Sequence, residues 1–156
     1  MMKKRRVYTD TSVIGGCFDP EFATWSNGLF KDFENGVYQP VLSEVVAHEI
    51  KSAPKHVINK FGELANYDAE YVYITNIVME LTELYIGRKI LTEKYYNDAS
   101  HIALATVYEV DILASWNFRH IVRFDKIQLF NAVNLEQGYK MISIYSPNLI
   151  TTTLIA

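Results

Sequence analysis

Three acidic residues stand where the chain could bring them to one site. Asp10 lies in residues 7–14, an apolar segment that predicts a short strand carrying a carboxylate near its end. Glu49 and Asp98 stand at the edges of later apolar segments. In open α/β sheets, ligands bind outside the carboxyl ends of the strands. An acid at the end of a strand therefore faces a cleft in which it can hold a metal ion.

The chemistry of such a cluster follows from its charge. Three carboxylates that converge repel one another strongly unless a cation neutralises them. Mg²⁺ and Mn²⁺ prefer oxygen ligands, and Mg²⁺ keeps several waters, so a few carboxylates suffice. We expect Asp10, Glu49 and Asp98 to bind such an ion, and the chemistry that follows is metal-assisted hydrolysis of a phosphodiester.

Each acid also has a simpler interpretation. Asp10 can cap a turn, and Asp98 can cap the helix that follows it. Glu49 can be a solvated helix residue, as most glutamates are. Glu44 and Glu93 are nearby competitors that rank lower. Spacing alone therefore leaves both interpretations open.

A group of basic residues follows a late apolar segment of the chain. Asn117 precedes Arg119, His120, Arg123 and Lys126. Cations beside a metal site can hold the phosphate backbone of a nucleic acid. A solvated basic surface is the alternative interpretation.

Two further groups of residues have a structural and a functional interpretation. His101 lies one helical turn after Asp98 among small residues, which favours a hydrogen-bonded core histidine over a ligand of Mg²⁺. Tyr95 and Tyr96 can stack on unpaired bases, although such residues more often pack inside the protein.

Strand and helix patterns alternate along the chain. Strands are expected at residues 7–14, 37–42, 71–74, 111–115 and 141–145. Helices are expected at residues 21–35, 44–50, 57–64, 76–90, 99–108 and 126–134, with Ser43 as an N-cap and Gly36 closing the first helix. This alternation predicts a three-layer α/β/α domain with a mostly parallel central sheet and right-handed crossovers.

Length and composition limit the class of protein. At 156 residues the chain predicts a single domain over residues 1–156. A net charge of −3 excludes wholesale electrostatic coating of nucleic acid, but it allows a local basic patch. The lone cysteine cannot form an internal disulfide, which suits a reducing cytoplasm. No apolar run approaches the ~20 residues of a membrane span, so no membrane association is expected.

Four segments in order carry a family resemblance. They are Asp-Thr-Ser at residues 10–12, Ser-Glu-Val-Val-Ala-His-Glu-Ile at 43–50, Asp-Ala-Ser-His-Ile-Ala-Leu-Ala at 98–105, and Ile-Leu-Ala-Ser-Trp-Asn-Phe at 112–118. The chain resembles PIN-domain proteins over residues 7–144. These are small metal-dependent ribonucleases that include the toxins of bacterial toxin–antitoxin pairs.

The resemblance implies roles for particular residues. Asp10, Glu49 and Asp98 match the metal-binding acids, and Ser12 matches a hydroxyl position beside the first acid. Asn117 takes a fourth catalytic position at which the family often has an aspartate, so this site holds one negative charge fewer.

The same resemblance implies a substrate and partners. Ser12, Ser115, Arg119 and His120 are expected to contact the substrate, which would be RNA. The implied cofactor is Mg²⁺ or Mn²⁺, and the implied protein partners are a small antitoxin and a second copy of the chain.

Two other classes of enzyme and signalling protein fit the sequence less well. The start of the Asp10 motif resembles the aspartate-nucleophile motif of haloacid-dehalogenase-like phosphatases, but Ser12 stands where they need a second aspartate. A response-regulator receiver would need an acidic pair that the chain lacks. A PIN-like module that binds RNA or protein without cutting it remains the alternative, because Asn117 departs from the pattern.

Overall fold

The computed structural model describes residues 3–154. Five strands form one sheet in the order β3-β2-β1-β4-β5, and each neighbouring pair is parallel. The strands are β1 (Arg5–Thr9), β2 (Tyr38–Ser43), β3 (Glu70–Val72), β4 (Ile112–Ala114) and β5 (Ser143–Tyr145). The expected parallel sheet is confirmed, and every carboxyl end of a strand lies at one edge of it.

The central strand contributes side chains to both faces of the sheet. Val7 belongs to one apolar core, and the next residue, Tyr8, belongs to the other. Strand β4 alternates in the same way, with Leu113 between Ile112 and Ala114. Since successive side chains of a strand point to opposite faces, helices must cover the sheet on both sides.

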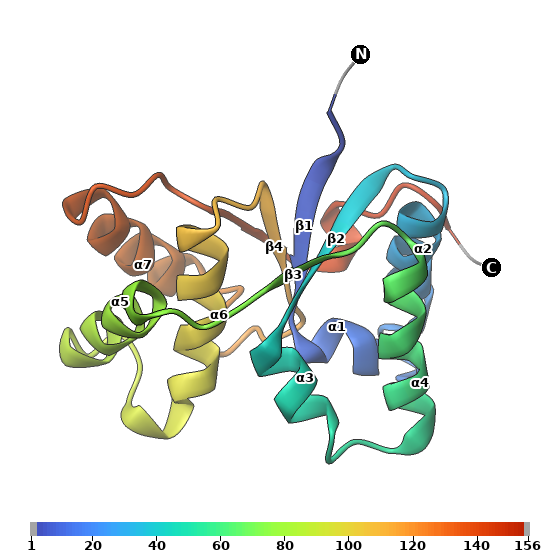
Figure 1. Cartoon of the computed structure of the whole chain (residues 1–156), viewed down its shortest axis with the longest axis horizontal. Coiled ribbons are helices and arrows are strands. Elements are labelled where there is room, and N and C mark those ends of the chain that lie inside the picture. The colour runs from blue at the N-terminus through green and yellow to red at the C-terminus, as the bar shows by residue number, and fades with distance from the viewer. Residues whose placement is uncertain (1–2, 155–156) are drawn as a thin grey trace.

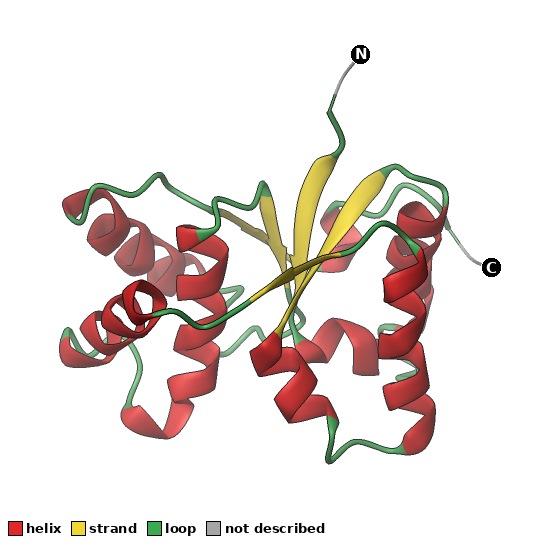
Figure 2. Cartoon of the chain, viewed as in Figure 1, coloured by secondary structure: helices red, strands yellow, loops and turns green. Residues whose placement is uncertain are grey.

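Helices supply these two covers, as Figures 1 and 2 show. One side carries α5, α6 and α7, and the other carries α1, α2 and α4. The three-layer α/β/α architecture expected from the sequence is therefore confirmed. The α-helices are α1 (Thr11–Gly16), α2 (Ala23–Glu34), α3 (Glu44–Ile50), α4 (Lys55–Glu63), α5 (Asn76–Gly87), α6 (Tyr96–Val107) and α7 (Phe124–Glu136), and the 3₁₀ turns are η1 (Leu64–Asn66), η2 (Glu93–Tyr95) and η3 (Pro147–Leu149).

The largest correction concerns residues 7–14. The strand ends at Thr9, and helix α1 begins at Thr11. Asp10 stands between them as the N-cap, and its side chain accepts the backbone N–H of Val13. The apolar residues Val13 and Ile14 are buried as helix residues rather than strand residues. A capping acid followed by close packing thus overrides the β propensity of this short segment.

Smaller corrections shift helix ends. Helix α5 stops at Gly87 rather than residue 90, because Lys89 has a left-handed backbone with φ of 62°. Helix α6 starts at Tyr96, so Asp98 lies inside its first turn and does not cap it. Helix α7 starts two residues earlier than expected. Ser43 is confirmed as the N-cap of α3, and Gly36 ends α2 with φ of 76°.

The topology explains why distant acids meet. Asp10 follows β1, and α3, which carries Glu49, follows β2 directly. Helix α6 precedes the parallel strand β4, so its first turn lies at the edge where the strands end. Within residues 3–154, no helix is long and apolar enough to cross a membrane.

Candidate active site

Asp10 is held at the end of the central strand by hydroxyl groups. Its side chain is buried, with 4% exposed. The Oδ1 atom accepts the Ser12 hydroxyl at 2.6 Å and the Oδ2 atom accepts the Ser115 hydroxyl at 2.5 Å. Burial raises the pKa of Asp10, although the His101 charge and both hydroxyls act in the opposite direction. Burial therefore opposes ionisation of Asp10, and the two hydroxyl contacts fix the orientation of its side chain.

Glu49 faces the same region from α3. Its Oε1 atom accepts the Thr11 hydroxyl at 2.8 Å and lies 2.8 Å from Nε2 of His101. Burial alone would raise the pKa of Glu49, but the His101 hydrogen bond and charge and the Thr11 hydroxyl lower it below its usual value. Glu49 is therefore a stable carboxylate that α1 and α6 both fix in place.

His101 connects Glu49 to a buried hydroxyl chain. Its Nδ1 atom lies 2.6 Å from the Tyr8 hydroxyl, which lies 2.7 Å from the Ser43 hydroxyl. The Ser43 oxygen also accepts the backbone N–H of Val46 at the start of α3. Each of these buried polar groups has a partner, as stability requires. His101 is thus the hydrogen-bonded core residue that its sequence context favoured, and it also positions an acid.

Asp98 projects from the first turn of α6. Its Oδ2 atom lies 3.0 Å from Nδ1 of His120, which belongs to the loop after β4. Its Oδ1 atom has no hydrogen bond to any residue of the described range 3–154. Asp98 and His101 are three residues apart and share one face of the helix.

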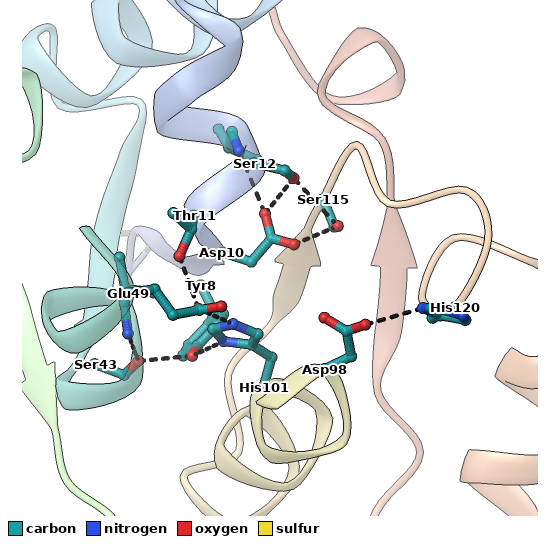
Figure 3. Close-up of polar contacts among 12 residues, drawn as sticks. Tyr8, Asp10, Thr11, Ser12, Ser43, Glu49, Asp98, His101, Ser115 and His120 are labelled. Atoms are coloured by element: carbon teal, nitrogen blue, oxygen red, sulfur yellow. Dashed lines mark hydrogen bonds and ion pairs between the residues drawn. The ribbon is translucent and has the colours of Figure 1, made fainter. Parts of the chain in front are cut away.

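The three acids surround one space. Figure 3 shows their carboxyl groups facing a common region beside His101. Burial alone would lower the pKa of His101, but the Glu49 hydrogen bond and the charges of Asp10, Glu49 and Asp98 raise it. The charges of all three acids thus act on the same buried imidazole, in agreement with the common region that their carboxyl groups face.

A cation would meet oxygen donors here, since carboxylates are the ligands that Mg²⁺ and Mn²⁺ prefer. In the conformations present, however, no three His, Cys, Asp or Glu side chains of residues 3–154 are arranged to hold a metal ion. Both oxygens of Asp10 accept hydroxyls, and one oxygen each of Glu49 and Asp98 is engaged. The donor chemistry fits a hard cation, because a carboxylate oxygen that accepts one hydrogen bond keeps a further lone pair for a metal ion.

Asn117 shapes the loop beside this cluster. Its Oδ1 atom accepts the backbone N–H groups of Arg119 and His120 at 3.2 and 2.9 Å. Its own N–H donates to the hydroxyl of Ser115. The side chain therefore stabilises a turn, while a role of Asn117 in cleavage stays a prediction.

The serines predicted to contact substrate have defined protein partners. Ser12 donates to Asp10 and accepts the backbone N–H of Trp116 at 2.9 Å. Ser115 donates to Asp10 and accepts the N–H of Asn117. In this structure both serines orient Asp10, and contact with a substrate stays a prediction.

Two cavities adjoin the acids. One, of about 330 Å³, is lined by Glu49, Asp98, Tyr95 and neighbouring residues. The other, of about 220 Å³, is lined by Arg119, His120, Arg123 and Lys126 together with Lys89, Thr92 and Tyr95. The structure thus gathers all four basic residues singled out in the sequence. It adds Lys89, which follows α5, and no sequence pattern predicts that Lys89 lies beside the other four.

Sequence reasoning missed the residues that hold the acids. Thr11, Tyr8 and Ser43 were not assigned to the site, although the first directly follows Asp10 and the last caps α3. The one sequence feature that could have indicated such a supporting residue is the three-residue spacing of Asp98 and His101, which places them on one face of a helix. Glu44, a competitor of Glu49, instead accepts the backbone N–H of Ile74.

Comparison with known proteins identifies a solved structure that shares this fold. No known protein family matches the sequence, and no curated protein gives a significant match. A solved structure does match: the crystal structure of VapBC2 from Rickettsia felis bound to a DNA fragment from their promoter. The alignment covers 90% of this chain and 98% of the matched chain, with a TM-score of 0.56 and 12% sequence identity. At this identity the likeness establishes a shared fold.

Proposed function

We propose that this protein is a metal-dependent endoribonuclease of the PIN-domain type. The observation that carries the proposal is that the carboxyl groups of Asp10, Glu49 and Asp98 face one region beside the buried His101, at the carboxyl edge of the sheet. The ordered sequence motifs and the shared fold with a VapBC2 chain support it. Asp10, Glu49 and Asp98 would hold Mg²⁺ or Mn²⁺.

The bound cation would supply Lewis-acid activation of the phosphodiester and of water. The protein's own groups then have distinct tasks. Ser12 and Ser115 hold the Asp10 carboxylate, Thr11 and His101 hold Glu49, and His120 holds Asp98. Water would lose a proton and add to phosphorus as hydroxide, the bond from phosphorus to the 3′ oxygen would break, and that oxygen would take up a proton, which leaves a 5′-phosphate and a 3′-hydroxyl. Arg119 and its basic neighbours would hold the RNA backbone.

The proposal includes protein partners. The matched structure is described as VapBC2 bound to promoter DNA. By analogy, we infer that this chain works in the cytoplasm as the toxin of a pair, with a small antitoxin and with a second copy of itself. A small open reading frame directly upstream of the gene would support this inference.

The decisive experiment incubates purified protein with labelled RNA and Mn²⁺, with and without EDTA. We expect cleavage that EDTA stops and that Asp10→Asn and Asp98→Asn each reduce by at least about 100-fold, the scale seen when an essential group is removed. Asp68→Asn is the matched control, because this exposed aspartate lies just before β3 at the opposite edge of the sheet. Undiminished cleavage by Asp10→Asn would place the nuclease activity elsewhere or in a contaminant.

A non-cleaving PIN-like module that binds RNA or protein is the second candidate. It is favoured by Asn117, which brings no charge to the position where the family often has an aspartate, and whose side-chain oxygen accepts the N–H groups of Arg119 and His120. RNA that binds and stays intact across a range of Mn²⁺ concentrations would favour this module over the nuclease.

A further inference from the structure

The smaller cavity beside the acids has a strongly cationic lining. We name it the basic cavity and define it by Lys89, Thr92, Arg119, His120, Arg123 and Lys126. We propose that the basic cavity is a phosphate-binding subsite, which holds a non-scissile phosphate of the strand whose neighbouring phosphate lies at Asp98. The assignment of that strand as RNA rests on the proposed function, whereas phosphate binding itself does not.

The charge of the basic cavity is the first observation that carries this proposal. Its lining includes two lysines and two arginines and no Asp or Glu, in a chain of net charge −3. Within residues 3–154, Arg119 and Lys89 form no ion pair. Concentrated positive charge without acidic partners attracts anions to that place.

The remaining cations are held by groups that leave donors free. Lys126 donates to the backbone oxygen of Ile90 at 2.5 Å, and an ammonium group has two further N–H donors. Arg123 pairs with Asp125 at 2.8 Å, but both side chains are more than half exposed, so solvent weakens this pair. Arg123 also precedes α7, and the amino end of a helix carries partial positive charge.

Tyr95 orders the wall on the side of the acids. The Arg119 guanidinium lies 5.7 Å from the centre of the Tyr95 ring, and the His120 ring centre lies 3.9 Å from it. A guanidinium on an aromatic face keeps its N–H donors available for bidentate contact with a phosphate. The basic cavity therefore presents a positioned donor set rather than a loose cationic surface.

The basic cavity also has a fixed relation to the acids. Tyr95 lines both cavities, and His120 lines the basic cavity while it contacts Asp98. A strand with one phosphate at Asp98 would pass Tyr95 and place its next phosphate among Lys89, Arg119 and Lys126. This arrangement favours a polynucleotide over an acidic peptide, because phosphates repeat along the strand and neighbouring phosphates can occupy both cavities at once.

The test measures binding without metal. A fluorescent single-stranded 2′-O-methyl RNA trinucleotide, which lacks the free 2′-hydroxyl, is titrated in EDTA by anisotropy with the unchanged protein, Arg119→Gln, Lys89→Gln and Lys140→Gln. Lys140 is the charge-matched control, since it is highly exposed and precedes β5 at the opposite edge of the sheet. We expect about 10-fold weaker binding for Arg119→Gln and for Lys89→Gln, and little change for Lys140→Gln. Each lost phosphate contact should also reduce the salt slope of log K by about 0.7.

Competition distinguishes the sources of the anion. Inorganic phosphate should displace the trinucleotide, and oligoglutamate at equal charge should displace it more weakly. Equal displacement by oligoglutamate would overturn the proposal in favour of an acidic protein partner. An effect of Lys140→Gln equal to that of Arg119→Gln would overturn it in favour of diffuse attraction.

The subsite and the proposed nuclease can fail separately. Arg119-dependent binding without cleavage in any metal would refute the nuclease and keep the subsite. Cleavage together with unchanged trinucleotide binding by Arg119→Gln would refute the subsite and keep the nuclease.

Discussion

The Nε2 atom of His101 lies 2.8 Å from the Oε1 atom of Glu49, so a buried imidazole of α6 fixes an acid of α3. His101 has 2% of its surface exposed and contacts the Tyr8 hydroxyl through its other ring nitrogen. A carboxylate held in this way cannot rotate freely. His101 is therefore a positioning residue for Glu49 and a part of the core at the same time.

Replacement of His101 by leucine should destabilise the protein. The Tyr8 hydroxyl would lose its partner at Nδ1, and Glu49 would lose its strongest donor, at a cost of about 1–3 kcal/mol. Urea denaturation in EDTA measures the change, and a double-mutant cycle with Glu49→Gln isolates the pair. We expect a coupling of about 0.5–3 kcal/mol, as for other contacting residues. A coupling of zero would mean that the contact contributes nothing to stability.

The sequence predicted the acids but not what holds them. Asp98 and His101 were recognisable as neighbours because three residues along a helix return to one face. The contact between His101 and Glu49 joins residues 52 positions apart. That contact depends on how α6 packs against α3, and no local pattern of residue types encodes such packing.

In the fold as well, local sequence patterns predict most elements, whereas packing between distant segments decides the remainder. Within residues 3–154, apolar spacing predicted all five strands and six of the seven α-helices, because each carries apolar residues at strand or helix spacing. It failed at α1, a six-residue helix with Val13 and Ile14, which resembles a continuation of β1. The Asp10 cap and the contact of α1 with the core decide its conformation, and a residue window this short cannot reveal either.

Asp10→Asn should leave the metal-free protein at least as stable as the original at pH 7. Burial raises the folded-state pKa of Asp10, so the unfolded chain releases this proton more readily and stability falls as pH rises through the ordinary and then the raised pKa. An asparagine removes the charge, can still accept from Ser12, and can donate to the Ser115 oxygen. Thermal unfolding in EDTA at pH 4 and pH 7 measures the effect.

The comparison between the two pH values is the control. The difference in melting temperature between Asp10→Asn and the original should be larger at pH 7 than at pH 4, where the carboxyl is closer to neutral. A clear loss of stability at pH 7 would show that the carboxylate's hydrogen bonds outweigh its desolvation.

Asn117→Asp should fold normally and lower the Mn²⁺ concentration needed for half-maximal cleavage. One carboxylate oxygen can accept the N–H groups of Arg119 and His120 as the amide oxygen does. The second oxygen replaces the amide nitrogen, which forms no hydrogen bond within residues 3–154, so the added charge can attract a nearby cation. Titration of Mn²⁺ against both proteins measures the concentration for half-maximal cleavage. An unchanged concentration would mean that residue 117 lies outside the coordination sphere and only stabilises the turn.

Cys17 should resist alkylation while the protein is folded. Burial raises the pKa of the thiol to about 12, and only 6% of the residue is exposed. At pH 8 the reactive thiolate would be only about 0.01% of the total, and reagent access is restricted as well. Iodoacetamide labelling followed by mass spectrometry should show little modification in buffer and complete modification in concentrated urea. Rapid labelling in buffer would reveal frequent local opening around α1.

Asp32→Ala should release the C-terminal segment from α2. The buried Asp32 carboxylate accepts the backbone N–H of Thr152 and the hydroxyls of Thr152 and Thr153, at 2.6–2.8 Å. This segment lies so close to α2 that a Cβ atom on Gly28 would stand 2.1 Å from the Thr153 backbone oxygen. Loss of three hydrogen bonds to one charged group should reduce the free energy of unfolding by about 3 kcal/mol.

Glu34→Ala is the control for Asp32→Ala, since it removes a half-exposed acid from the same helix. Urea denaturation and limited proteolysis measure both effects. Equal stability and equal cleavage near residue 152 in the two variants would show that the Asp32 carboxylate does not hold this segment.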